Sequence, residues 1–432
     1  MTPQSTVVIV APIRPEGLSD LRQLLLGMNA RPGEADPHNR LVPFAQLDTL
    51  HFARFVILDD QTIADFAVYG LPKPSYPIYL LFLAEFDGDR ETFMQRLCKS
   101  AQEGLRQIFS RCTGFTADVD LIQWLGEREV RPSTYYFAWR GGTMRQVRQE
   151  EQLREAIINY LQSSPELSGL PASQIHGALR QYVVKRIADG TIPLTPDSPT
   201  PLSWKLRNIA DLIAVPLTLL LAFPLLLIYA PLYLFQLRRR ENRDPVITPK
   251  PDPDSVRRLA AIEDYGRTNQ FSAMGSLKPG PFRRWTGVFV LWIINYSTRH
   301  IFNRGRLARV LSIHSASWTF IDDRRRLFFA SHYDGSLESY MDDFVNKVAF
   351  GLNVTFSNGM GYPKTRWLLM DGAKDEQSFK YFIRRHQLPT EVWYNGHACL
   401  TNANLERNRR IRKGIETKVM TDDEARRWFA LF

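Results

Sequence analysis

The side chains with the clearest potential for chemistry in this sequence are Arg54, Glu85 and His332. Arg54 lies in the alternating stretch "HFARFVILDD", and Glu85 and His332 each stand two residues before an Asp-Gly pair. Successive side chains of a strand point to opposite faces, so we expect all three on the faces turned away from the covering helices. There, Arg54 and Glu85 could act catalytically beside an imidazole. The alternative is that Glu85 and His332 are exposed at strand ends.

Other histidines offer a second set of candidate ligands. His386 ends the predicted helix "SFKYFIRRH", where a basic residue can also simply complement the helix dipole. His397 stands close to Cys399, but Cys–His catalysis depends on a spatial arrangement that spacing alone does not define. His51 and His314 begin two similar predicted strands, and we expect a structural role for both.

Recognisable catalytic and metal-binding motifs are absent from the sequence. There is no GxSxG, P-loop or HExxH motif, and no GxGxxG follows a predicted strand. The three cysteines form no CxxC pair, which argues against a disulfide framework and a structural zinc site. This cysteine usage is typical of a reducing compartment.

One segment of the chain occurs twice. Asp87-Gly88 aligns with Asp334-Gly335, and the similarity continues without a gap to Gly114 and Gly361. Further similar pairs follow the same order along the chain: "HFARFVILDD" with "HSASWTFIDD", "PSTYYFAW" with "LPTEVWYN" and "EEQLREAI" with "NRRIRKGI". Several similar blocks in the same order indicate an internal duplication.

Each repeat is predicted to contain two strands, a helix, a third strand and a final helix. In the first repeat the stretch "TADVDLIQWLGEREV" is shorter than its counterpart, and we expect it to lack one helix. Helices stacked on one face of an antiparallel sheet make a ferredoxin-like unit. The predicted fold class is therefore α+β, with two ferredoxin-like units and an inserted membrane-associated helical segment.

Two such units in one chain resemble the tandem α+β-barrel superfamily of chlorite dismutase-like and dye-decolourising-peroxidase-like proteins. The resemblance implies two sheets that face each other around a pocket, and a heme as cofactor. It implies that His332 is the metal ligand, that Arg54 is its polar partner, and that His386 is a second candidate, since the axial histidine of these proteins belongs to the C-terminal half.

A long apolar run separates the two repeats. From Leu212 to Leu237 the chain has 26 uncharged residues, enough for a helix of about 39 Å. Prolines at 216, 224 and 231 interrupt it, and basic residues flank both ends. We expect a re-entrant hairpin that turns near Pro224 and dips into one leaflet, helped by an interfacial segment that starts at Trp285. The alternative is that both segments are buried helices of a soluble core.

The positive charge of the chain lies next to this run. The net charge is +10, and the segment from Arg238 to Arg309 contains 15 Lys and Arg against 6 Asp and Glu. This distribution favours an anionic membrane surface, on the cytoplasmic face, over nucleic acid.

The predicted organisation is a first repeat at 1–162, a spacer at 163–204, a membrane-associated hairpin with a basic linker at 205–310, and a second repeat at 311–432. Two functions fit this organisation. The first is a membrane-attached oxidoreductase of heme-peroxidase-like type that acts on an apolar or lipidic substrate. The second is a non-catalytic membrane-surface protein that binds lipid or serves as a scaffold.

Overall fold

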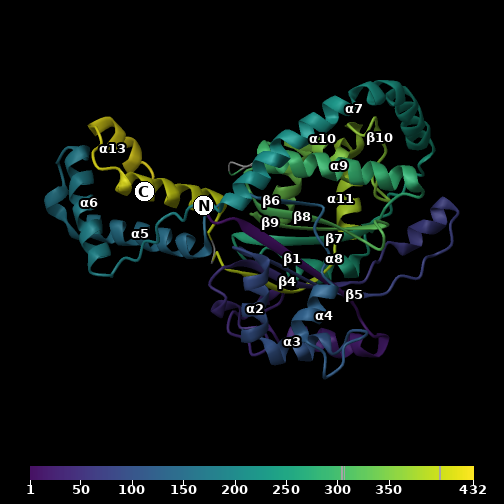
Figure 1. Ribbon diagram of the computed structural model, residues 1–432, viewed down its shortest axis with the longest axis horizontal. Coiled ribbons are helices and arrows are strands. Elements are labelled where there is room, and N and C mark those ends of the chain that lie inside the picture. The colour runs from purple at the N-terminus through teal and green to yellow at the C-terminus, as the bar shows by residue number, and fades with distance from the viewer. Residues whose placement is uncertain (303–304, 306, 398–399) are drawn as a thin grey trace.

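The computed structural model describes residues 1–302, 305, 307–397 and 400–432 and shows a mixed α+β protein (Figure 1). Its centre consists of two four-stranded antiparallel sheets. Apolar side chains from the two sheets pack against each other, among them Val8, Val56 and Leu83 of the first and Phe328 and Ala330 of the second. The sheets therefore lie face to face, with helices on their outer sides.

Each sheet takes three strands from one half of the chain and its fourth strand from the other half. The first sheet has the order β1-β5-β4-β12 and the second the order β6-β8-β9-β7. The strands are β1 (Gln4–Pro12), β4 (Leu50–Leu58), β5 (Tyr79–Asp87), β6 (Thr134–Phe137), β7 (Thr268–Ser276), β8 (Ile313–Ile321), β9 (Arg326–Asp334) and β12 (Thr390–Asn395). Because β6 and β12 each pair with the opposite half, neither sheet is complete without the other part of the chain.

Strand β7 was not expected from the sequence. It falls inside 205–310, which the sequence analysis assigned wholly to the membrane-associated hairpin and its linker, yet it forms an edge of the second sheet against β9. Its residues, "TNQFSAMGS", contain few branched apolar side chains and several small polar ones. Strand propensity is weak in such a stretch, and pairing with β9 determines its conformation.

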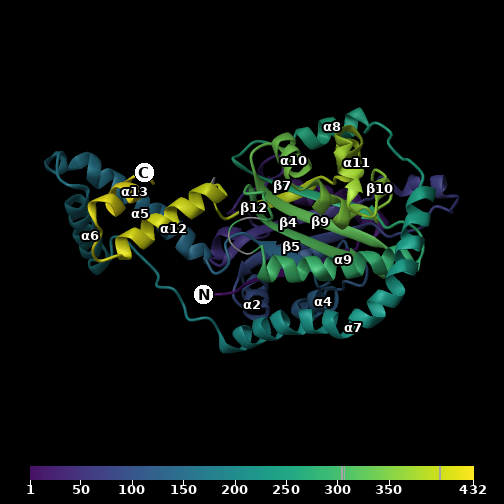
Figure 2. The ribbon, with the colours of Figure 1, turned by 90° about the horizontal axis from the view of Figure 1, so that it is seen from above.

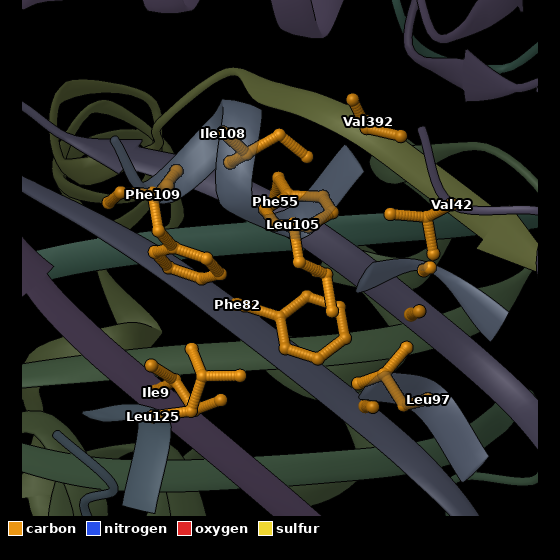
Figure 3. Packing of buried hydrophobic residues seen from close by; sticks show 14 of the residues in the cluster. Ile9, Val42, Phe55, Phe82, Leu97, Leu105, Ile108, Phe109, Leu125 and Val392 are labelled. Atoms are coloured by element: carbon orange, nitrogen blue, oxygen red, sulfur yellow. The ribbon is translucent and has the colours of Figure 1, made fainter. Parts of the chain in front are cut away.

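Helices cover the outer face of each sheet. On the first sheet these include α2 (Arg90–Ser100), α3 (Gln102–Phe109) and α4 (Leu121–Glu127); on the second they include α9 (Pro281–His300), α10 (Leu337–Phe356) and α11 (Glu376–His386). Figure 3 shows Phe55 and Phe82 of the first sheet among Leu105, Ile108 and Phe109 of α3. Helix α4 occupies the stretch that the sequence analysis expected to lack a helix. It is only seven residues long, and Asp120 caps it by accepting a hydrogen bond from the backbone of Gln123.

The main helical segment of each half breaks at the same aligned position. Ala101, between α2 and α3, has φ −128° and ψ 23°, and Val348, inside α10, has φ −146° and ψ 33°. Three residues further on, the aligned glycines Gly104 and Gly351 follow these breaks. The two halves therefore share a local backbone feature as well as a strand order.

A bundle of four helices projects from one end of the sheets (Figures 1 and 2). The four are α5 (Met144–Ser163), α6 (Ala172–Ala188), α12 (Asn402–Glu416) and α13 (Asp422–Phe429). They enclose a core that includes Leu153, Leu179, Ile411 and Trp428. Helix α6 belongs to the stretch 163–204 that was expected to be a spacer, and it packs instead as one wall of this bundle.

The remaining elements are shorter or peripheral. They are α1 (Leu18–Leu26), α7 (Leu202–Arg243), α8 (Pro253–Ala260), the small strands β2 (Asn29–Arg31), β3 (Glu34–Ala35), β10 (Thr365–Arg366) and β11 (Met370–Asp371), and the 3₁₀ turns at Pro15–Gly17, Phe44–Gln46, Ile63–Tyr69, Pro165–Leu167 and Gly372–Lys374.

The aligned glycines provide a test of how α3 packs. A Cβ at Gly104 would collide with the backbone of Leu41, whereas a Cβ at Gly351 would meet only the Cβ of Val348, at 4.0 Å. We expect Gly104→Ala to lower the free energy of unfolding by about 1–3 kcal/mol, because backbone cannot move aside as a side chain can. The matched Gly351→Ala should be neutral or stabilising by up to about 1 kcal/mol, since alanine favours a helix. Denaturant unfolding of both variants measures the change in the free energy of unfolding. Equal changes in the two variants would contradict the prediction.

Candidate membrane-binding site and buried polar cluster

The structure brings Arg54, Glu85 and His332 together between the two sheets. Arg54, on β4, is fully buried and reaches across to the second sheet. Its guanidinium donates hydrogen bonds to the carbonyl of Phe271 (2.7 Å), the hydroxyl of Ser272 (2.8 Å) and the carbonyl of Ser331 (3.0 Å). Burial lowers the pKa of Arg54 to about 10. The guanidinium therefore joins the sheets by donating to backbone carbonyls that are buried between them.

Glu85 and His332 occupy the same layer. The Glu85 carboxylate accepts a hydrogen bond of 2.5 Å from the hydroxyl of Ser315, and it lies 3.8 Å from Nδ1 of His332. Burial raises the pKa of Glu85 to about 7 and lowers the pKa of His332 well below its usual value, because a charge is poorly solvated there. Both side chains are buried, so the alternative that they are exposed at strand ends is wrong.

The space around His332 has no room for a heme. Its imidazole lies against the ring of Phe52, with 3.9 Å between ring centroids, and Trp393 lies on another side. A cavity that borders Phe52 has a volume of about 20 Å³, close to that of a single water. Among the described residues no group of three or more His, Cys, Asp or Glu is arranged to hold a metal ion. The expected open pocket between the sheets is thus filled by side chains.

A second polar arrangement occurs twice, at the start of β4 and at the start of β8. His51 contacts a carboxylate oxygen of Asp87 at 2.9 Å, and the other oxygen accepts from the backbone nitrogen of Met144, the first residue of α5. His314 contacts Asp334 at 2.7 Å, and Asp334 accepts from the backbone nitrogen of Asn402, the first residue of α12. We call these two arrangements the histidine–aspartate clips. They attach the helical bundle to the sheets through carboxylates at helix N-termini.

The sequence did not predict that these histidines and aspartates interact, although both residue types stand at matching positions of the two repeats. The repeated Asp-Gly pairs were recognised only as helix starts, whereas each aspartate in fact caps a helix that begins more than fifty residues later. His397 joins one clip, because its Nε2 lies 2.8 Å from Nδ1 of His51. Cys399, its suggested partner, lies outside the described residues.

His386 lies elsewhere, on the outer face of the second sheet. It is buried at the end of α11, where its Nδ1 bonds to the carbonyl of Phe382 and its Nε2 has no hydrogen-bond partner in the described part of the chain. It borders an apolar cavity of about 270 Å³ between this sheet and α9, α10 and α11. A heme does not fit this site. The imidazole packs so tightly on Gly275 that a Cβ there would lie 3.1 Å from Nε2, and the described lining residues include no Lys or Arg to pair with propionates.

Helix α7 is the one described helix that is long and apolar enough to cross a membrane, by length and composition. It is a single helix of 42 residues with Pro216, Pro224 and Pro231 inside it, rather than the hairpin expected from the sequence. Proline removes one backbone hydrogen bond and kinks a helix without ending it, and α7 follows a bent path along the outside of the second sheet (Figures 1 and 2). Its apolar window is not buried, and Leu221 and Ile228 are 72% and 70% exposed.

Two groups of contacts hold α7 against the neighbouring helix α9. At one end, Asp211 forms an ion pair with Arg299, and the hydroxyl of Tyr296 donates to the carbonyl of Leu212. At the other end, the hydroxyl of Tyr233 lies 3.2 Å from that of Thr286. The two helices therefore run in opposite directions.

Buried charges anchor the C-terminal end of α7. The carboxylate of Asp244, just after the helix, accepts from Lys278 at 2.8 Å and from Arg283 at 2.6 Å. Glu241 accepts from the backbone nitrogens of Trp367 and Leu368, both at 2.9 Å. Burial lowers the pKa of Lys278 to about 8. These bonds connect α7 firmly to the folded core.

No family model, curated protein or solved structure matches this chain.

The raised pKa of Glu85 predicts a pH dependence of stability. Between pH 4.5 and about pH 7 the folded state retains a proton that the unfolded state has released, so the free energy of unfolding falls as the pH rises. Between pH 5 and pH 8, the free energy of unfolding of the unmodified protein should fall by about 2–3 kcal/mol more than that of Glu85→Gln. Denaturant unfolding across this range measures the difference.

Glu424→Gln is the control for this measurement. Glu424 is exposed, and hydrogen bonds from Thr421 lower its pKa, so relative to Glu424→Gln the unmodified protein should show no fall in stability between pH 5 and pH 8. Parallel pH curves for Glu85→Gln and the unmodified protein would show that Glu85 has an ordinary pKa.

Proposed function

We propose that the protein attaches to one face of a membrane, with the apolar part of α7 inserted into a single leaflet. The observation that carries this proposal is the contrast between the exposed apolar middle of α7 and its firmly bonded ends. A water-soluble protein rarely exposes so large a continuous apolar surface. In a leaflet the same side chains would be buried in hydrocarbon.

The contacts with α9 support a path that returns to its starting side. A helix rises about 32 Å from Leu212 to Tyr233, whereas on α9 the corresponding contacts, at Tyr296 and Thr286, are separated by about 15 Å. The tyrosine side chains that make these contacts span part of the difference, and the bent path of α7 accounts for the rest (Figures 1 and 2). The prolines allow this bend. Because both ends bind the same helix, a shallow arc in one leaflet fits the geometry better than a crossing.

The charged residues near α7 support an anionic membrane surface as partner. Lys205 and Arg207 are exposed before the apolar part, and Arg239 is exposed after it. On α9, Trp285 and Phe289 are exposed, as expected for a helix at headgroup depth. Anionic lipids are characteristic of the cytoplasmic leaflet, so we place the protein on that face.

We also propose that the two halves arose by duplication of one ferredoxin-like unit. The support is the sequence repeat, the matching strand orders, the aligned helix breaks at Ala101 and Val348, and the two histidine–aspartate clips. In this interpretation the polar layer of Arg54, Glu85 and His332 joins the two units. A heme-dependent oxidoreductase is not part of the proposal, because neither His332 nor His386 has space for the cofactor.

Vesicle flotation tests the membrane proposal. The full-length protein should float with vesicles containing anionic lipid and bind less as salt is raised. Replacing Leu220, Leu221 and Leu227 together by Glu should weaken binding at least 100-fold, since burying one leucine contributes about 1.5–3 kcal/mol. Val419→Glu is the matched control, because Val419 is exposed on the distant helical bundle. Equal flotation of the triple variant and the control would refute the proposal.

Cysteine labelling tests the path of α7. Ser203→Cys and Asn242→Cys, placed at its two ends in a Cys399→Ser background, should react with a membrane-impermeant maleimide from the same side of sealed vesicles. Cys98 and Cys112 are buried and should stay unlabelled in the folded protein. Labelling of the two ends from opposite sides would establish a crossing instead.

A further inference from the structure

The apolar cavity on the outer face of the second sheet has the character of a ligand site. It has a volume of about 270 Å³, nearly twice the roughly 150 Å³ of an engineered cavity that accommodates benzene. Its floor is formed by strand residues such as Phe271, Trp318 and Phe329, and its walls by α9, α10 and α11. Space of this size beside a well-packed core is costly unless something fills it.

The lining determines the charge of a suitable ligand. Among the described residues that line the cavity there is no Asp, Glu, Lys or Arg. An ionised group placed there would lose its hydration without gaining a partner. The described lining therefore favours a neutral group in the part of the ligand that enters.

Two buried polar atoms on the lining side chains have no hydrogen-bond partner among the residues that the structure describes. They are Nε1 of Trp318 and Nε2 of His386, and each side chain belongs to a residue that is at least 95% buried. An indole N–H can only donate, and its burial without an acceptor is unfavourable. A ligand with an ester, carbonyl or hydroxyl oxygen would supply that acceptor.

The position of the cavity links it to the proposed membrane surface. Ile294, Ser297 and Thr298 of α9 line it, and the same helix carries the contacts with α7. Phe350 of α10 also lines it and is 58% exposed, so the lining extends to the surface. An apolar molecule could pass from the leaflet along α9 without entering water.

We propose that this cavity binds a neutral single-chain lipid that carries an ester or hydroxyl group, taken up from the membrane. The inference rests on the proposed function for the route of entry, while the site itself depends only on the cavity and its lining. The volume suits one chain or part of one, and the apolar walls exclude a free carboxylate.

The experiment compares two probes that differ only in charge. Full-length protein in detergent micelles is titrated with the methyl ester of dibromostearic acid or with dibromostearate itself at pH 8, and quenching of tryptophan fluorescence is followed. The ester should quench saturably at one molecule per protein, with at least tenfold higher affinity than the anion. Trp318→Phe should remove most of this quenching. Equal affinities for the two probes would overturn the assignment of a neutral ligand.

Two glycine variants locate the binding. Gly351 lines the cavity, and a Cβ there makes only an ordinary contact, so Gly351→Leu should fold and take up part of the space. In the quenching titration, this variant should bind the ester with an affinity at least tenfold lower than that of the unmodified protein. The matched control is Gly177→Leu, in α6, where a Cβ meets nothing within 4 Å and affinity should be unchanged. Unchanged binding in Gly351→Leu would place the ligand elsewhere and overturn the proposal.

Flotation of the same variants separates this inference from the membrane proposal. Gly351→Leu should float with anionic vesicles as the unmodified protein does, because the arc of α7 is intact. Flotation without saturable ester binding in the unmodified protein would overturn the cavity site and leave membrane attachment in place. Saturable ester binding without flotation would overturn membrane attachment alone.

Discussion

The exchange of edge strands is the constraint on which the rest of this structure depends. A sheet edge presents unpaired backbone N–H and C=O groups, and here one edge of each sheet is completed by a strand from the opposite half of the chain. The exchange keeps the sheets face to face. It also directs the chain outward at one end, where α5 follows β6 and α12 follows β12 to build the helical bundle.

The histidine–aspartate clips reinforce this arrangement at the point where the chain leaves the sheets. Asp87 ends β5 and Asp334 ends β9, and each carboxylate holds both a histidine of its own sheet and the first backbone nitrogen of the following bundle helix. Between the sheets, Arg54 adds bonds to two strands of the opposite sheet. Each of these bonds forms only in the present alignment of the sheets, so together they favour that alignment over others.

Helix α7, in the inserted segment, is held in place by contacts with the folded core. Helix α7 is bonded to α9 at two places and to the core by Asp244 and Glu241, so its apolar arc is held in one orientation. The outer face of the second sheet carries both this support and the apolar cavity. Through α9, the proposed membrane surface and the proposed lipid site share one structural element.

Part of the fold could be predicted from local patterns. Alternation identified the strands around Arg54 and His332 and the faces on which these side chains lie, whereas the burial of His332 remained one of two alternatives. Among the missed elements were β7, which has weak propensity, and the helices α1, α4 and α13, each of fewer than ten residues. The expected hairpin at Pro224 failed because proline signals a kink but does not specify whether the helix ends there.

The sequence by itself determined two similar α+β segments, a basic and apolar insertion between them, and the faces on which the polar strand residues lie. These are local properties, set by periodicity, charge and turn residues. Only the tertiary structure decided which strand completes each sheet, that side chains fill the space around His332, and that a cavity remains beside Trp318 and His386. Those outcomes depend on how residues far apart in the chain pack together, and no local pattern encodes the volume left between them.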